Sequence, residues 1–450
     1  MNHELSHRST APDRGVDVND DTTAPGSASP MLSRRTLLRA GVVSAAFLGS
    51  AAVLGTRTRG SSAIAAGGLT TTRKVHLAAT DGWVSLPENY SIPGYFPDTL
   101  APDPYNMYVF GFRDVTGLSD SAMIAERGKA QISAPVLAFD QDTQVEVTLT
   151  NLGLSQRPDL VDGHTMHWHG FNNAIPIFDG VPEMSASVPI GKSLTYLFRP
   201  RDAGTYMYHC HFEDVEHVQM GMTGLVFVRP TINKDTTRNP NHYTCVYNDL
   251  ATRYDREYPL FLSENMPEDH WRDAHIQVSD WSDYIPGFGL FNGRAYPDTE
   301  QRSFDPMKTY TATNTAPGVD PAVANQLKYQ PQGSLIEAHP GEIVLLRVAH
   351  LGSVRHTITI DGVPLHVIGA DATQLKNPDG SDNSYWTNGI DLGPGESRDV
   401  LFTAPEVGEY LIYDRNVQNL TNNGGAGYGG MLTKLIVKPA GEALTAQTVV

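Results

Sequence analysis

The segment from Tyr208 to Met222, YHCHFEDVEHVQMGM, contains one cysteine between two histidines, followed by a third histidine and two methionines. A copper ion that cycles between the +1 and +2 states favours one thiolate, two imidazoles and a weak axial thioether. Cys210, His217 and Met222 supply three of these ligands, and His164 is the natural candidate for the second imidazole. Of the two methionines, Met222 is preferred because its Gly-Met pair recurs later in the chain. The segment therefore predicts a blue-copper site.

Four further histidines have the spacing of ligands that share one face of a strand. His167 and His169 are separated by one residue, and His209 and His211 flank Cys210. Because alternate residues of a strand point to the same face, both pairs are expected to face away from the thiolate. We expect a second metal site, with Cys210 as a short covalent electron path between the two sites.

The elements that must position these residues are short strands. Apolar or alternating runs such as TQVEVTLTNL, SLTYLFRP, EIVLLRVAH and EYLIYD are separated by turn residues. None of these segments has a long helical period. The pattern predicts an all-β sandwich architecture.

The chain also repeats itself. HTMHWHG, AGTYMYHCH and GMTGLVFV in the first half match HTITIDG, VGEYLIYDR and GMLTKLIV in the second. We therefore predict two copies of one sandwich, at residues 70–230 and 258–440, joined by a polar linker at 231–257.

The second copy lacks the metal ligands of the first. Thr359 and Asp361 stand where the first copy has its histidine pair, and residues 413–415, Tyr-Asp-Arg, replace His-Cys-His. His356 and Met431 persist, but without a thiolate we interpret them as structural residues. The second copy is expected to be copper-free.

Composition excludes some classes of partner. The formal charge of −17 argues against nucleic acid or an anionic membrane surface as the main partner. The chain has two cysteines, Cys210 and Cys245, so a metal-bound Cys210 rules out an internal disulfide. Cys245 is expected to be a small buried hydrophobe.

The N-terminal segment, residues 1–66, has the pattern of an export signal. Arg34 and Arg35 precede the apolar run AGVVSAAFLGSAAVLG, which is short for a membrane span, and the small residues SSAIAAGG follow. This resembles a twin-arginine signal, with cleavage expected near Ala65 or Ala66. We predict an exported protein, extracellular or in the cell envelope, with no membrane span in the mature chain.

The motifs HTMHWHG, FDGVPE, AGTYMYHCH and HVQMGM resemble those of the multicopper oxidases, the family of laccases and their two-domain bacterial relatives. The resemblance implies tandem cupredoxin-like Greek-key domains. It also implies a type 1 copper that takes single electrons from a small reductant docked near His217, and a type 2/type 3 copper cluster that reduces dioxygen to water. By this resemblance the type 1 ligands are His164, Cys210, His217 and Met222. The cluster ligands are His167, His169, His209 and His211.

Three features depart from that family or leave alternatives open. Five residues separate His211 from His217, where laccases commonly have three, and Asp179 is either an acid that assists proton delivery or an ordinary turn residue. The family's cluster uses eight histidines, of which this chain supplies four. None of His270, His275, His339, His350 and His366 shows the His-x-His spacing. A homo-oligomer, with a trimer favoured, or another polypeptide is expected to complete the cluster.

The alternatives are a copper nitrite reductase and an electron carrier or copper-binding protein that retains only the type 1 site. The nitrite reductase family differs at the positions of His167 and His211, and its histidine from the second domain corresponds to Arg415. The reductant is expected to be a phenol or a metal ion, and the acidic composition favours cations such as Cu(I) or Mn(II).

Overall fold

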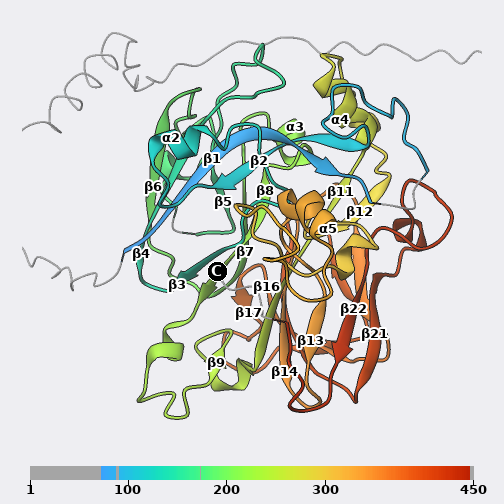
Figure 1. Cartoon of the computed structure of the whole chain (residues 1–450). Helices are drawn as coiled ribbons and strands as arrows, with labels where there is room; N and C mark the ends of the chain where they lie inside the picture. Colours follow the sequence, from blue (N-terminus) through green and yellow to red (C-terminus); the bar gives the residue numbers. More distant parts are fainter. Residues whose placement is uncertain (1–71, 88–90, 173, 446–450) are drawn as a thin grey trace, which may run out of the picture. The chain divides into compact units, whose positions relative to one another are not determined.

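The computed structural model describes residues 72–87, 91–172 and 174–445 (Figure 1). The predicted signal segment lies outside the described residues. Strands dominate the rest, and the prediction of an all-β fold is confirmed. Among the described residues, no helix is long and apolar enough to cross a membrane.

The first pair of sheets holds the strands of the first half of the chain. One sheet has the order β2-β1-β4-β6, and the other has the order β3-β8-β7-β5. Their bounds are β1 Thr72–Ser85, β2 Asn106–Asp114, β3 Leu137–Asp140, β4 Gln144–Asn151, β5 His167–His169, β6 Ser193–Phe198, β7 Gly204–His209 and β8 Thr223–Arg229.

A second pair of sheets follows after the short ribbon of β9 (Thr244–Cys245) and β10 (Arg253–Tyr254). One sheet has the order β12-β11-β14-β20-β16-β17, with β18 also paired to β16, and the other has the order β13-β22-β21-β15-β19. The bounds are β11 Arg256–Asn265, β12 Phe288–Phe291, β13 Ile336–Ala338, β14 Ile343–His350, β15 His356–Ile360, β16 Leu365–Ala370, β17 Thr373–Gln374, β18 Tyr385–Thr387, β19 Ile390–Leu392, β20 Ser397–Thr403, β21 Gly408–Asp414 and β22 Leu432–Val437.

Helices are short and lie in the connections. The α-helices are α2 Asp120–Ile124, α3 Asp214–Gln219, α4 Pro267–Ala274 and α5 Pro321–Gln326. The 3-10 turns are η1 Pro176–Phe178, η2 Thr231–Lys234, η3 Leu250–Thr252, η4 Trp281–Asp283, η5 Asp298–Glu300, η6 Leu327–Tyr329 and η7 Val417–Leu420.

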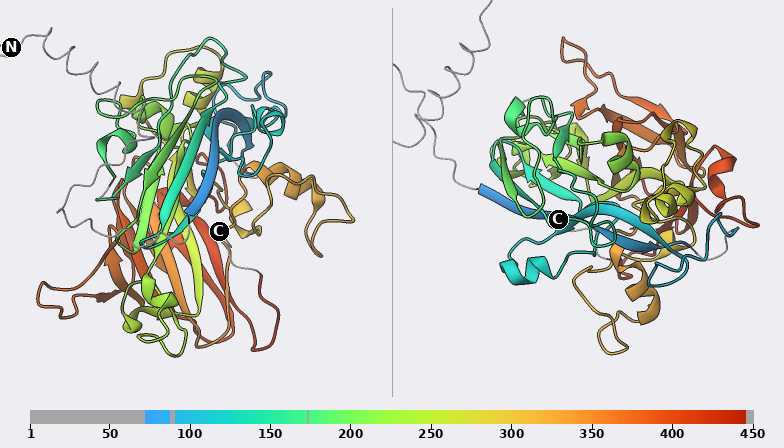
Figure 2. Two further views of the ribbon diagram at one scale, coloured as in Figure 1. Left: turned by 90° about the vertical axis from the view of Figure 1, so that its left-hand side faces the viewer. Right: turned by 90° about the horizontal axis from the view of Figure 1, so that it is seen from above.

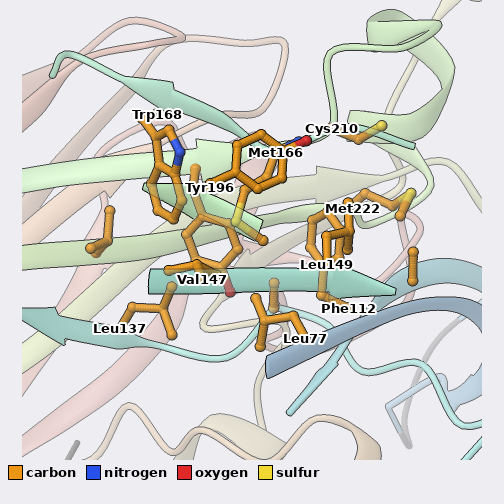
Figure 3. Packing of buried hydrophobic residues seen from close by; sticks show 14 of the residues in the cluster. Leu77, Phe112, Leu137, Val147, Leu149, Met166, Trp168, Tyr196, Cys210 and Met222 are labelled. Atoms are coloured by element: carbon orange, nitrogen blue, oxygen red, sulfur yellow. The ribbon is translucent and has the colours of Figure 1, made fainter. Parts of the chain in front are cut away.

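The alternating sequence of the strands explains the cores. In β4, Val145, Val147 and Leu149 are fully buried, while the intervening polar side chains face the other side of the sheet. They pack with Trp168 and Tyr196, and the same cluster includes Cys210 and Met222 at one end (Figure 3). The chemically active residues are therefore anchored in the first core.

The two pairs of sheets also contact each other. β7 and β8 lie against β11, β14 and β20 (Figure 2). Within this contact Thr205 donates a hydrogen bond of 2.6 Å to Asp399, whose carboxylate also accepts from Tyr247 and Arg347. Arg347 pairs in addition with Glu257, so a buried ionic network fixes the strand that ends at His209 against the second half of the chain.

Candidate metal centre

Two connections bring the four predicted blue-copper ligands together at one end of the first core. Cys210 follows the last residue of β7, Met222 precedes β8, and His217 lies on α3 between them. The N–H of Cys210 donates to the carbonyl of Met222 (3.0 Å), and the N–H of Met222 donates to the carbonyl of His217 (2.9 Å). His164 arrives from a separate connection, held by a backbone bridge to Val188.

The spacing of these side chains suits a metal ion. The Sγ atom of Cys210 lies 3.3 Å from Nδ1 of His217 and 3.9 Å from Nδ1 of His164. Ligands placed around a metal at bonds of about 2.0–2.3 Å are separated by about 3–4 Å. The backbone N–H of Thr165 also points at Sγ, at 3.5 Å. The soft sulfur and two imidazoles therefore form a donor set that fits copper.

Burial keeps this donor set uncharged in the metal-free protein. Desolvation raises the pKa of the Cys210 thiol to about 11 and lowers the pKa of His217 to about 4. The pKa of His164 is lowered well below its usual value for the same reason. Neutral imidazoles offer lone pairs, and a bound cation would compensate the buried thiolate.

The four remaining histidines gather on the opposite side of Cys210. Strand register places His167 on β5 directly opposite His209 on β7. Ring centres lie 5.0 Å apart for His167 and His209 and 5.1 Å apart for His167 and His211. Ligand nitrogens of His167, His169 and His209 lie within 4.8 Å of one another. Alternation along the strands thus separates these rings from the thiolate, as the sequence predicts.

Hydrogen bonds to carbonyl oxygens orient three of these rings. Nδ1 of His167 donates to the Asp179 carbonyl (2.7 Å), and Nδ1 of His209 donates to the Cys210 carbonyl (2.8 Å). A carbonyl can only accept, so each ring keeps the lone pair of Nε2 for a metal. The His169 ring bonds to the backbone of Gly395, which lies in the turn between β19 and β20 of the second half. Burial lowers the pKa of His209 to about 3, so that ring is neutral.

His211 lies beside these three rings, but its side chain is more exposed than that of His167. Its Nδ1 lies 3.9 Å from the Asp214 carboxylate, and its side chain is 30% exposed. Asp179, predicted to be either a proton-delivering acid or an ordinary turn residue, places its carboxylate 3.5 Å from Nδ1 of His167 in addition to its carbonyl contact. Both the carbonyl and the carboxylate of Asp179 therefore lie beside Nδ1 of His167, where they orient this ring.

Carboxylates beside His217 were not singled out by the sequence motifs. Oxygens of Asp162 and Glu213 and a ring nitrogen of His217 lie within 4.8 Å of one another. His217 is fully buried, and its Nε2 atom has no hydrogen-bond partner among the described residues. Within that same part of the chain, neither the Asp162 nor the Glu213 carboxylate forms a hydrogen bond or ion pair. Glu213 lies in the connection between His211 and His217, which is longer than in laccases. The longer connection therefore places an additional carboxylate beside His217.

The second pair of sheets contains a copy of the blue-copper geometry with an aspartate in the position of the cysteine. Asp414 donates its N–H to the Met431 carbonyl (3.1 Å) and accepts from the Thr357 N–H (3.2 Å), as Cys210 does with Met222 and Thr165. The register pairs Thr359 with Tyr413, which matches the pairing of His167 with His209.

An imidazole flanked by two carboxylates occupies this second position. Nδ1 of His356 bonds to Asp414 (2.6 Å) and Nε2 bonds to Glu264. Burial alone would lower the pKa of His356, but these two partners raise it to about 9. His350 also lies nearby, yet its Nε2 is already bonded to the Val354 carbonyl (2.7 Å). A protonated imidazole therefore fills the space that a metal would need.

The remaining candidate histidines are engaged elsewhere. Their partners are the Tyr108 carbonyl for His270, Asp98 for His275, the Lys438 carbonyl for His339 and Ser384 for His366. The two cysteines are both free, and Cys245 is fully buried, as predicted.

Comparison with known proteins places these motifs in one family. Two family models, both described as multicopper oxidase, match residues 125–233 and 266–431. Laccase-1 of Emericella nidulans is 36% identical over 97 residues, which are 21% of this chain and 14% of the relative. Laccase 1 of Metarhizium majus is 27% identical over 156 residues, which are 34% of this chain and 22% of the relative. The aligned segments therefore span a small part of these relatives.

Solved structures show the same fold. A blue copper oxidase from Nitrosomonas europaea is 21% identical with a TM-score of 0.56, over 82% of this chain and 86% of that one. The multicopper oxidase mgLAC is 18% identical with a TM-score of 0.56, over 83% of this chain and 88% of that one. At these identities the likeness concerns the fold alone.

Proposed function

The chain belongs to the multicopper oxidase family, and we propose that it is an exported oxidase that takes single electrons from a small reductant and passes them to dioxygen, forming water. The observation that carries this proposal is the pairing of Cys210, His164 and His217 at metal-ligand spacing with four imidazoles directly behind the cysteine. Export rests on the pattern of residues 1–66, which predicts a twin-arginine signal.

The residues divide the chemistry between two sites. His164, Cys210 and His217, with Met222 as axial ligand, would hold the type 1 copper, which supplies one-electron redox chemistry. The Cys210 backbone leads directly to His209 and His211, and the Cys210 carbonyl accepts the hydrogen bond that orients His209. This covalent connection gives electrons a short path from the buried thiolate to the second site.

The surroundings of His217 favour a metal cation as the reductant. A fully buried ring gives an aromatic substrate no surface to touch. Asp162 and Glu213 place two carboxylates beside the His217 ring, and neither carboxylate has a hydrogen-bond or ion-pair partner among the described residues. Carboxylate oxygens are hard ligands, which suit hard cations better than soft ones. Hard carboxylates therefore favour Mn(II) over Cu(I) within the cationic class.

Completion of the second site requires a second polypeptide. His167, His169, His209 and His211 approach from one side, and the equivalent positions of the second half carry Thr359, Asp361, Tyr413 and Arg415. We propose a homo-oligomer, with a trimer favoured, and another polypeptide is the alternative source of ligands.

A second candidate function is supported by the same observation. A chain with one full blue-copper site and half of a cluster would serve as an electron carrier without oxygen chemistry. Copper analysis with electron paramagnetic resonance separates the two functions. The oxidase requires a type 1 signal, additional copper at the second site and oxygen uptake with a reductant, whereas one copper per chain without oxygen uptake would leave the carrier.

Cysteine variants test the ligand assignment. Cys210→Ser should abolish the blue absorption, because the colour arises from the copper–thiolate bond. Cys245→Ser is the matched control, since Cys245 is the other buried free cysteine. Blue colour that survives in Cys210→Ser would show that the assignment is wrong.

A further inference from the structure

The burial of His217 raises a question about large reductants. The ring has 0% exposed surface, so a bulky donor at the protein surface cannot touch this ligand. An electron from such a donor must cross at least one layer of protein side chains. The side chains packed against His217 therefore decide which electron paths exist.

A row of aromatic rings runs from β1 and β2 to His217. Ring centres lie 5.2 Å apart for Trp83 and Tyr108, and 5.6 Å apart for Tyr108 and Phe110. Phe110 in turn packs edge-on against His217, again at 5.6 Å. Trp83 and Tyr108 are directly opposite each other across β1 and β2, and Phe110 follows two residues later on the same face.

The two ends of this row differ in exposure. Tyr108 and Phe110 are fully buried, whereas Trp83 is only partly buried and lies at the edge of the first core. The N–H of Phe110 donates to the Met220 carbonyl (3.0 Å), which ties β2 to the copper loop. The row thus joins a partly exposed indole to a buried copper ligand through rings fixed on one strand pair.

The hydroxyl group of Tyr108 has a proton acceptor next to it. Its hydroxyl donates to the buried Asp81 carboxylate at 2.8 Å, and Asp81 is held by the N–H of Gln156 at 2.6 Å. Burial and the adjacent Asp81 raise the pKa of Tyr108 far above its usual range, so the phenol keeps its proton until it is oxidised. A phenol that is hydrogen-bonded to a carboxylate can lose an electron and transfer its proton in place.

We propose that Trp83 and Tyr108 form an electron relay from the protein surface to His217, which serves one-electron donors too large to reach the carboxylates beside that ring. This inference rests on the proposed type 1 site.

The steps balance for one electron. In the forward direction one electron passes from the donor through Trp83, Tyr108 and Phe110 to His217 and the oxidised type 1 site. The rings bridge this transfer, Tyr108 keeps its hydroxyl proton, and the net change is one electron moved from the donor to the type 1 site. A stronger oxidant at the surface would instead oxidise Tyr108, whose hydroxyl proton would pass to Asp81.

Flash photolysis tests the relay without turnover. The copper-loaded protein is reduced, and a photogenerated ruthenium(III) polypyridyl complex in solution serves as a bulky oxidant that draws electrons out along the same path. In the unmodified protein a tyrosyl radical absorption should precede the return of the blue absorption. Tyr108→Phe should remove the radical signal and slow the blue recovery about tenfold or more, and Trp83→Phe should slow it similarly.

Matched controls keep the test specific. Tyr254→Phe removes another buried tyrosine that donates to a carboxylate, Glu257 at 2.9 Å, and Trp281→Phe removes another tryptophan that packs at the edge of the first core. Among the described residues, neither ring makes a ring contact with Trp83, Tyr108 or Phe110, so both controls should recover at the normal rate. Equal recovery in all variants would overturn the relay, whereas absence of blue absorption in the unmodified copper-loaded protein would overturn the proposed function instead.

Discussion

At the scale of single residues, the unpaired carboxylates beside His217 are the feature that links the copper loop to a substrate class. Asp162 precedes the ligand His164 by two residues, and Glu213 lies in the connection between His211 and His217. Glu213 has a left-handed backbone, with φ of 50°. A non-glycine residue in this region carries strain, which in folded proteins gathers at functional sites. The loop thus places the Glu213 carboxylate next to the ligand His217 by means of a strained backbone conformation.

Neutralising these carboxylates should weaken the oxidation of a cationic metal reductant. Asp162→Asn and Glu213→Gln should each raise KM for Mn(II) about two- to fivefold, because an exposed ion pair contributes up to about 1 kcal/mol. The blue absorption should not change, since neither side chain belongs to the proposed ligand set. Steady-state oxygen uptake with Mn(II) measures the effect, and Glu406→Gln in the second half is the control. An unchanged KM in both variants would remove the argument for a cationic reductant.

The clustering of the proposed ligand residues could be predicted from the sequence, whereas their surroundings could not. Alternation along a strand and the spacing around Cys210 identify both sets of imidazoles, because these patterns are local. Glu264, which bonds to His356, lies 92 residues away in sequence, and Asp162 meets Glu213 only after the chain folds. No local pattern encodes such contacts. The burial of His217 was missed for the same reason.

At the scale of elements, the turn that closes the copper loop depends on Gly221. Its φ is 120°, and a Cβ atom there would lie 2.4 Å from the Ile132 side chain and 2.7 Å from the Phe110 carbonyl. The residue sits between α3, which carries His217, and β8, which follows Met222. A glycine is therefore required both by the backbone conformation and by the close approach of β2.

Gly221→Ala should destabilise the protein and weaken the blue absorption. The strained backbone alone costs about 1–3 kcal/mol, and the clash with the Phe110 carbonyl would displace the loop. Gly191→Ala separates these contributions, because Gly191 has φ of 71° but no atom within 4 Å of the added Cβ. Thermal unfolding and the absorbance per bound copper measure both effects. Equal losses in the two variants would mean that close packing at Gly221 is unimportant.

The imidazole of the second half should give the protein a characteristic loss of stability at high pH. The pKa of His356 is about 9 in the folded protein and about 6.5 when unfolded. Because the folded pKa is the higher one, protonated His356 contributes its full stabilisation below about pH 6.5, the pKa in the unfolded chain. This contribution is lost as the pH rises through about 9. The shift corresponds to about 3 kcal/mol. Denaturant unfolding between pH 6 and pH 10 should show this fall, and His356→Asn should be less stable at pH 6 and lack it.

A matched histidine variant controls for other groups that titrate at high pH. His339 is a histidine of the same half whose Nδ1 bonds to the Lys438 carbonyl rather than to a carboxylate. His339→Asn should therefore keep the fall in stability. If His356→Asn keeps it as well, the pair of carboxylates around His356 does not stabilise the second half in this way.

At the scale of the whole molecule, the two halves divide structural and redox roles. The second half keeps the geometry of a copper site but fills it with an imidazole and carboxylates, while its strands support β7 through Arg347 and Asp399. The sequence predicts the two copies and the loss of ligands from the second. It does not predict the ionic network between them, because Arg347 contacts residues from three distant segments.

If another copy completes the second site, as proposed, the assembly state should depend on copper. The side chains of His167 and His211 remain 17% and 30% exposed, so ligands from another polypeptide can reach them. An ion bound between copies stabilises only the assembled form, by about 2.7 kcal/mol at a hundred times its dissociation constant. Chelation, or the variant His167→Asn with His169→Asn, should therefore shift the light-scattering mass from oligomer to single chains. The blue absorption of the double variant should persist, because its type 1 ligands are intact. A copper-loaded protein that stays a single chain, with copper at the second site, would show that no other copy contributes ligands.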